Sequence, residues 1–494
     1  MKGIKALNGY LFMLRDYASF IAVLAIVTAL YIPTLAYPTS SDSTAFAMNA
    51  KYYAEGDYSA DVPDPKRLPL FSVVSIPLAA VTGSYMLGIK LAAFVFGIIT
   101  VAAWLFIGKE LFNDTKWFPF LISCPLLILY ALFRPLADAP LICFSLLSVL
   151  FLLKAQKRKE YFYLSGLFFS LAVLSSYIGI FLGAAYLLIF AMEKRRPNKE
   201  FAIAVGSGFF VVLLVLLGNL AAHGSILPGA YAEKISGESS GLSFFTRPLL
   251  ILWLQMPDIL LFLGLSLPLL PFFVKGFFRL SKKRDLSLIL LFLVSLGFGI
   301  VSGSAFRYLI MAVAFFLMIS FAGFSPVKNT GLKWVFLLGI AIYLVATPYF
   351  VNGQAKELAD SFVFTPPTWG QDGLRYAEAA YWMKMNLPQN SIIVSGQQQI
   401  WDEYTREDLT FLNYLGLESA HRNRFYFLYD RTTPDAIDDV YVYPNGTAER
   451  FGQKPEGLET EWDFLKENYA IEPVFQSGRA GSLITLYRLT PNSV

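Results

Sequence analysis

Long uncharged stretches recur along most of the chain and limit what it can fold into. Unpaired backbone groups are costly in lipid, so a stretch of this kind crosses a bilayer as a helix. The stretches predict about eleven membrane-spanning helices. They are 18–37, 86–108, 117–133, 139–153, 162–176, 178–192, 201–222, 257–274, 286–301, 308–324 and 334–350. The sequence thus indicates an α-helical polytopic membrane protein.

Composition supports this fold class and excludes several kinds of partner. With 56% hydrophobic and 15% charged residues, the chain is too apolar for a soluble protein of 494 residues. Lys and Arg lie in short clusters between apolar stretches and not in a stripe mixed with aromatic residues, so nucleic acid is not expected to bind. Only two cysteines and two histidines are present, so we predict no His/Cys metal site.

The distribution of basic residues predicts the orientation. Lys and Arg are concentrated in alternate segments between the apolar stretches, and basic segments stay on the cytoplasmic side. We therefore expect a cytoplasmic amino terminus and a multi-pass protein of the cell membrane. Residues 1–350 would form the membrane domain, with long outer loops at 38–85 and 223–256, and residues 351–494 would lie outside the cytoplasm.

The tail after residue 350 changes abruptly in composition, and its pattern predicts a small extracytoplasmic α/β domain. Short stretches with helical and strand patterns alternate there. The predicted helices are 374–385 and 461–468, and the predicted strands are 391–395, 440–444, 473–477 and 482–488.

Two acidic residues of the outer segments are candidates for acid–base chemistry. Asp42 follows the first predicted membrane helix, and Asp138 lies in the tight hairpin "FRPLADAP" between two others. A carboxylate at the mouth of the membrane can accept a proton from a hydroxyl group near neutral pH. Each has a structural alternative: Asp42 could cap a helix that begins near Ser41, and Asp138 could pair with Arg134 where two helices end.

Basic residues on the outer side run against the positive-inside bias and are candidates for binding a phosphate. Arg makes bidentate contacts to phosphate, whereas Lys acts as a point charge. The alternative is that these side chains extend to lipid headgroups, and Asp258 could simply be solvated at a helix end. The candidate phosphate-binding residues are Lys66, Arg67, Arg134, Arg247 and above all Arg307, and the candidate cavity-lining residues are Tyr52, Tyr53, Asp258 and Tyr308.

Three motifs, in their order and placement, resemble the GT-C membrane glycosyltransferases. They are "DSTAFAMNAKYYAEGDY" from Asp42 followed by "KRLPLF" from Lys66, then "LADAP" around Asp138, and "FRYL" around Arg307. The similarity is to the branch that contains the protein O-mannosyltransferases and the lipid A aminoarabinose transferases. It implies that Asp42 is the catalytic base, that Asp138 is a second active-site acid, and that Lys66, Arg67 and Pro69 lie near the donor phosphate.

The resemblance implies an inverting glycosyltransferase on the extracytoplasmic side. A sugar would pass from a dolichyl or undecaprenyl phosphate to a hydroxyl group of a glycan, lipid or protein acceptor. The reaction requires no cofactor, although it is compatible with a divalent metal ion. The sequence departs from the family at Ser43, where many relatives have a second acid, and at "KRLPL", which replaces "KPPL".

Other functions fit the same helices. A secondary transporter usually has a site at mid-membrane and paired repeats, and we find neither an acidic residue at mid-depth nor a repeat. An oligosaccharyltransferase or a glycan ligase would share the fold class. The strings "TWGQDG" and "IWDEY" are only weakly similar to the external motif of the oligosaccharyltransferases.

Overall fold

The computed structural model divides into two compact units. One comprises residues 1–32 and 46–356, and the other comprises residues 33–45 and 357–494. The residues whose structure is described are 21, 24–25, 28, 32, 35, 41–56, 67–112, 136–155, 157–192, 199–223, 269–282, 286–301, 310–327, 331, 334, 370–389, 391–395, 409–412, 425–429, 469–479 and 482–491.

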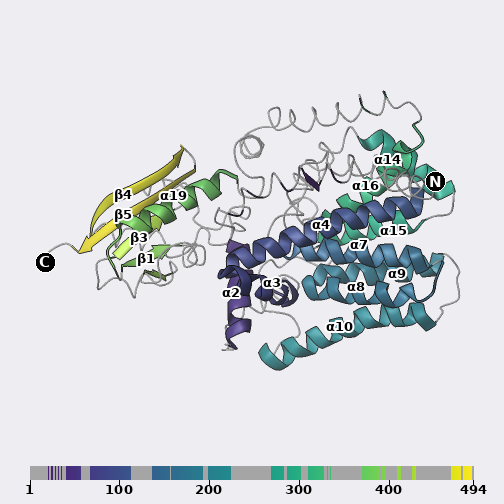
Figure 1. Ribbon diagram of the computed structural model, residues 1–494, viewed down its shortest axis with the longest axis horizontal. Helices are drawn as coiled ribbons and strands as arrows, with labels where there is room; N and C mark the ends of the chain where they lie inside the picture. The colour runs from purple at the N-terminus through teal and green to yellow at the C-terminus, as the bar shows by residue number, and fades with distance from the viewer. Residues whose placement is uncertain are drawn as a thin grey trace, which may run out of the picture. The chain divides into compact units, whose positions relative to one another are not determined.

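The first unit is built from apolar helices that lie side by side (Figure 1). Helix α4 packs against α3 and α7, α7 packs against α8, and α8 packs against α10, while α16 packs against α14 and α15. The helices are α3 (Leu70–Thr82), α4 (Tyr85–Phe112), α7 (Asp138–Ala155), α8 (Tyr161–Ser175), η2 (Tyr177–Ile180), α9 (Phe181–Met192), α10 (Lys199–His223), α14 (Leu270–Lys282), α15 (Ser287–Val301) and α16 (Ile310–Phe324).

Most of the predicted membrane stretches that fall on described residues coincide with a helix. Among the described residues, α4, α7 and residues 199–218 of α10 are long and apolar enough to cross a membrane, and the shorter apolar helices include α8, α15 and α16. The predicted stretch 117–133 lies outside the described residues. So do nearly all of 334–350 and most of 18–37.

Two helices of this unit extend beyond the predicted membrane stretches. The expected outer loop 38–85 contains α3, an apolar helix whose 13 residues are too few to cross the hydrocarbon alone. Of the predicted stretch 257–274, residues 257–268 lie outside the described residues, and α14 continues beyond residue 274 to Lys282. It does so because the basic side chains belong to a helix packed against α16, where Arg279 Nη1 donates a hydrogen bond to the Ala322 carbonyl oxygen at 2.7 Å.

Close contacts hold the helices together where the sequence has small or hydroxyl residues. Gly276 of α14 and Gly323 of α16 lie where the two helices cross, so near that a Cβ on Gly276 would lie 1.9 Å from the Ile319 carbonyl oxygen. Between α7 and α9, the Ser148 hydroxyl lies 2.6 Å from the Tyr186 hydroxyl. Such contacts hold helices together within lipid, because the hydrophobic effect does not drive their association there.

The second unit contains a five-stranded sheet with strand order β2-β1-β3-β5-β4. Strand β1 pairs in parallel with β2 and β3, and β5 pairs antiparallel with β3 and β4. Helix α19 (Gly370–Asn386) packs on the sheet, and Trp382 stacks on Phe475 with ring centroids 5.2 Å apart. The strands are β1 (Ile392–Ser395), β2 (Thr410–Leu412), β3 (Phe425–Tyr429), β4 (Tyr469–Arg479) and β5 (Ser482–Pro491).

Four elements predicted in the tail are confirmed, and two strands were missed. The confirmed elements are α19, β1, β4 and β5. Strand β2 has only three residues, and β3 is the continuous aromatic run "FYFLY", so neither shows the alternation that marks a strand. The predicted strand 440–444 and helix 461–468 lie outside the described residues.

Candidate active site

Asp42 is the second residue of α2 (Ser41–Glu55) and thus lies in its first turn. One turn later, Phe46 anchors α2 to α3. Its ring meets that of Phe71 edge to face at a centroid distance of 5.4 Å, and its carbonyl oxygen accepts a hydrogen bond of 2.9 Å from the Ser72 hydroxyl. The backbone after Asp42 is therefore fixed by buried contacts.

Arg67 lies directly before α3 and beside the same anchor. Its guanidinium carbon is 5.6 Å from the centroid of the Phe46 ring, which is a cation–π distance. Pro69 precedes the first residue of α3 and sets the direction in which the chain enters that helix. Arg67 is thus positioned by the contact between α2 and α3, and its binding to the donor phosphate stays a prediction.

Asp138 is the first residue of α7 and is half-buried, between the buried residues Leu136 and Ala139. The turn before it is closed by a 3.1 Å hydrogen bond from the Ala139 amide to the Leu136 carbonyl oxygen. A carboxylate at this position favours the amino-terminal end of α7 electrostatically. Asp138 is held close to the end of the helix bundle, as the short hairpin predicted.

Lys90 of α4 is a buried cation that the sequence prediction did not select. Its side chain is only 2% exposed. Burial of an ammonium group is costly unless the charge is paired or removed, so such a lysine requires partners within the protein. In the sequence, Lys90 lies within the predicted membrane stretch 86–108, and a charged residue in such a stretch indicates a functional site.

Two contacts show that Lys90 and Asp138 lie at the same level of neighbouring helices. Phe96 of α4 packs on Phe144 of α7 at 5.3 Å, and Lys154 of α7 lies 5.8 Å from the Phe106 ring of α4. Each pair has the same separation in the sequence, so the two helices run parallel in a constant register. Lys90 and Asp138 have that separation too, so they lie side by side at the end where both helices begin.

Of the other predicted site residues, Tyr52 and Tyr53 are described by the structure. Both are half-buried in α2. Asp42 falls in the unit of residues 33–45 and 357–494, whereas Asp138, Lys90 and Arg67 belong to the other unit, so the meeting of the two acids in one site stays a prediction. Outside the described residues lie Lys66, Arg134, Arg247, Asp258, Arg307 and Tyr308.

No metal-binding cluster is found in the part of the chain that the structure describes. Within it, no group of three or more His, Cys, Asp or Glu side chains could hold an ion.

Comparison with known proteins finds a family model that matches part of the chain. Residues 66–221 match the family model described as dolichyl-phosphate-mannose-protein mannosyltransferase. This stretch is less than half of the chain, and it contains Arg67, Lys90 and Asp138. No curated protein matches the chain significantly in sequence.

Solved structures share the fold along almost the whole chain. ArnT from Cupriavidus metallidurans, in a crystal structure with undecaprenyl phosphate bound, is 12% identical and has a TM-score of 0.65, with 95% of this chain and 98% of ArnT covered. The oligosaccharyltransferase AglB from Archaeoglobus fulgidus, in complex with an inhibitory peptide and a dolichol-phosphate, is 11% identical and has a TM-score of 0.51. That match covers 96% of this chain and 74% of AglB.

The predicted resemblance to the GT-C glycosyltransferases is confirmed by these matches. Residues 66–221 are thus similar to a family of glycosyltransferases, and almost the whole chain shares its fold with ArnT and AglB. Within that class, they agree with the branch of the protein O-mannosyltransferases and ArnT.

Proposed function

We propose that this chain transfers a sugar from a polyprenyl phosphate to an acceptor hydroxyl on the extracytoplasmic side of the membrane. The observation that carries the proposal is the family match over residues 66–221, because it spans Arg67 before α3, the buried Lys90 near the start of α4 and Asp138 at the start of α7. A donor phosphate at the bilayer surface, with its tail in hydrocarbon, requires a charged site at the end of a helix bundle.

The proposed reaction is a single displacement at the anomeric carbon. Asp42 accepts the proton of the acceptor hydroxyl, whose oxygen forms the new bond to the sugar. The bond from the anomeric carbon to the phosphate oxygen breaks, and polyprenyl phosphate leaves with the electron pair, so the configuration inverts. The cations Lys66, Arg67, Arg134 and Arg307 stabilise the charge that develops on the leaving phosphate.

Lys90 has a positioning role in this proposal. An ammonium group at the level of Asp138 attracts that carboxylate and restricts its rotamers. The ordered carboxylate can then contact the donor or the acceptor at the mouth of the bundle. This role follows from the shared register of α4 and α7 and from the burial of Lys90.

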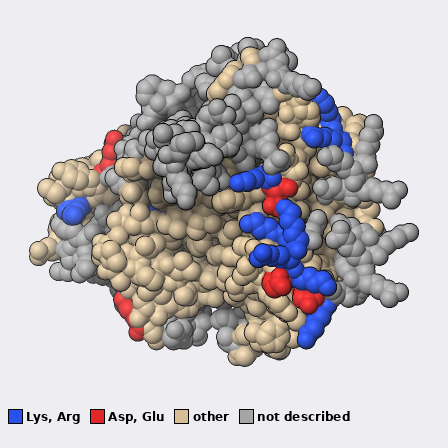
Figure 2. All heavy atoms as spheres, turned by 45° about the vertical axis from the view of Figure 1, so that its right-hand side comes forward, with Lys and Arg blue, Asp and Glu red and all other residues tan. Residues whose placement is uncertain are grey.

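The membrane arrangement in the proposal has eleven spanning helices and a cytoplasmic amino terminus. Residues 351–494 then lie outside the cytoplasm, and the α/β fold of that unit offers a surface that could select the acceptor. In Figure 2, Lys and Arg side chains gather in a band beside a broad uncharged surface. This distribution supports the proposed orientation, in which basic residues concentrate on the cytoplasmic side of the membrane.

Transfer of radiolabelled sugar from a panel of lipid donors tests this function. The purified chain in proteoliposomes would receive polyprenyl-phosphate monosaccharides of several sugars and, in a separate arm, a lipid-linked oligosaccharide. Transfer from a monosaccharide donor supports the proposal. Transfer from the oligosaccharide alone would point to an oligosaccharyltransferase. Solute flux without transfer from any donor would point to a transporter.

A further inference from the structure

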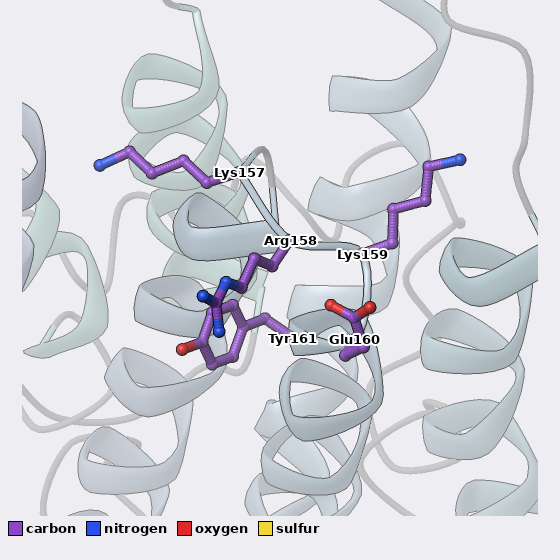
Figure 3. A pocket seen from close by; sticks show the side chains of 5 residues that line it. All are labelled: Lys157, Arg158, Lys159, Glu160 and Tyr161. Atoms are coloured by element: carbon purple, nitrogen blue, oxygen red, sulfur yellow. The ribbon is translucent and has the colours of Figure 1, made fainter.

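A basic hollow lies at the opposite end of α7 from Asp138. It has a volume of about 490 Å³ and is lined by Lys157, Arg158, Lys159, Glu160 and Tyr161, which connect α7 to α8 (Figure 3). Helix α7 has 18 residues, which corresponds to about 27 Å along its axis. The hollow is therefore separate from the candidate active site.

Two cations near the hollow already have partners. Lys157 forms an ion pair with Glu110 of α4. Lys154 lies among three aromatic rings, those of Phe106, Phe151 and Tyr161, at 5.7 to 6.0 Å from their centroids. These contacts fix the connection between α7 and α8 against α4, so the hollow has a rigid wall.

Arg158 and Lys159 supply the charge that is left for a ligand. Within the described part of the chain, neither forms an ion pair. In Figure 3 the Arg158 side chain extends alongside the ring of Tyr161, while Lys157 and Lys159 point away on opposite sides. Only Glu160 among the five lining residues is acidic. The arrangement offers the guanidinium group of Arg158 and the phenol of Tyr161 to an anion with several oxygen atoms, and Lys159 adds positive charge at the edge of the hollow.

The exposed face of α8 below the hollow is apolar. Leu164, one turn after the lining residue Tyr161, is 37% exposed, and Tyr163 and Leu167, further around the helix, are 46% and 50% exposed. A soluble phosphate has no apolar group that could contact this surface, whereas a phospholipid has a charged headgroup joined to apolar chains. The basic hollow is thus suited to a lipid headgroup, and the apolar face of α8 is suited to the acyl chains.

We propose that this hollow binds the headgroup of an anionic phospholipid, whose acyl chains lie along α8. In the orientation proposed above, the lipid belongs to the cytoplasmic leaflet, which is rich in anionic lipids. The bound lipid would fix the α7–α8 connection. The site involves neither Asp42 nor Asp138, so its existence is independent of the transfer reaction.

Lipid binding to the purified full-length chain in detergent tests the proposal. Native mass spectrometry would compare phosphatidylglycerol, phosphatidylcholine with the same acyl chains, and water-soluble glycerol 3-phosphate. The test variant is Arg158→Gln with Lys159→Gln. The control is Lys199→Gln with Lys275→Gln, which removes the same charge from exposed positions on α10 and α14. Size-exclusion chromatography would verify that each variant is folded.

We expect the wild type and the control to bind phosphatidylglycerol about tenfold more tightly than phosphatidylcholine, and the test variant to lose this preference. An Arg158→Lys variant that retains part of the preference would show that the effect is not a failure to fold. Equal loss in the test and control variants would overturn the proposal, because binding would then depend on overall charge. Equal binding of glycerol 3-phosphate would also overturn it, because the acyl chains would have no role.

Discussion

Lys90 and Asp138 lie at the same level of two parallel helices, one buried and the other half-buried at the end of the bundle. The register that places them there is set by two contacts further along the helices. One is the ring contact between Phe96 and Phe144, and the other is the cation–π contact between Lys154 and Phe106. A packed apolar interface thus determines that these two charged groups lie at the same level. The same helices lie within the segment that matches the family model.

Replacing Lys90 tests whether this cation positions Asp138. We expect Lys90→Met to lower kcat for sugar transfer by about 10²-fold with little change in the KM for the donor, because the orientation of a catalytic group is lost and donor binding is not. Lys90→Arg keeps the charge and should recover part of the activity. Lys51→Met, at an exposed position of α2, is the control. A raised donor KM with unchanged kcat would show instead that Lys90 binds the donor.

The crossing of α14 and α16 should tolerate no side chain at Gly276. A Cβ there would lie 1.9 Å from a backbone oxygen, so Gly276→Ala must push the helices apart. We expect a loss of about 1–3 kcal/mol in the free energy of unfolding, measured in detergent. At Gly297 of α15 nothing lies within 4 Å of the added Cβ, so Gly297→Ala should be neutral or slightly stabilising. Equal effects of the two changes would contradict the close crossing.

The hydroxyl cluster between α7, α8 and α9 should contribute to stability but not to catalysis. Tyr186 is buried, and its hydroxyl lies 2.6 Å from that of Ser148 and 3.5 Å from that of Ser165. We expect Tyr186→Phe to lower the free energy of unfolding by about 1 kcal/mol and to leave sugar transfer unchanged. Tyr163→Phe, on the exposed face of α8, should change neither quantity. Loss of transfer in Tyr186→Phe at unchanged stability would place this cluster in the active site.

The sequence predicted those parts of the structure that depend on long, uniform patterns. The stretches that became α4, α7 and α10 were recognised because each helix is apolar over at least 18 residues, close to the length that crosses the hydrocarbon. Helix α3 was missed because it is short, has Pro77 within it, and lies in a segment that we interpreted as a loop.

The site was predictable only in part, for a physical reason. Asp42 and Asp138 were visible because they border apolar stretches on the expected outer side. Lys90 was not selected because its importance depends on burial, and burial depends on how α3, α4 and α7 pack. The register of α4 against α7 comes from contacts between residues far apart in the sequence, which no local pattern contains.

The most direct test of the proposed function is sugar transfer by Asp42→Asn at matched expression, with the donor that the wild type uses. The amide cannot accept the proton, so we expect transfer to fall by about 10²- to 10⁴-fold while the variant remains folded. The control is Glu55→Gln, which neutralises an exposed carboxylate at the other end of α2 and should retain full activity. Transfer by Asp42→Asn at the wild-type rate would contradict the assignment of Asp42 as the base.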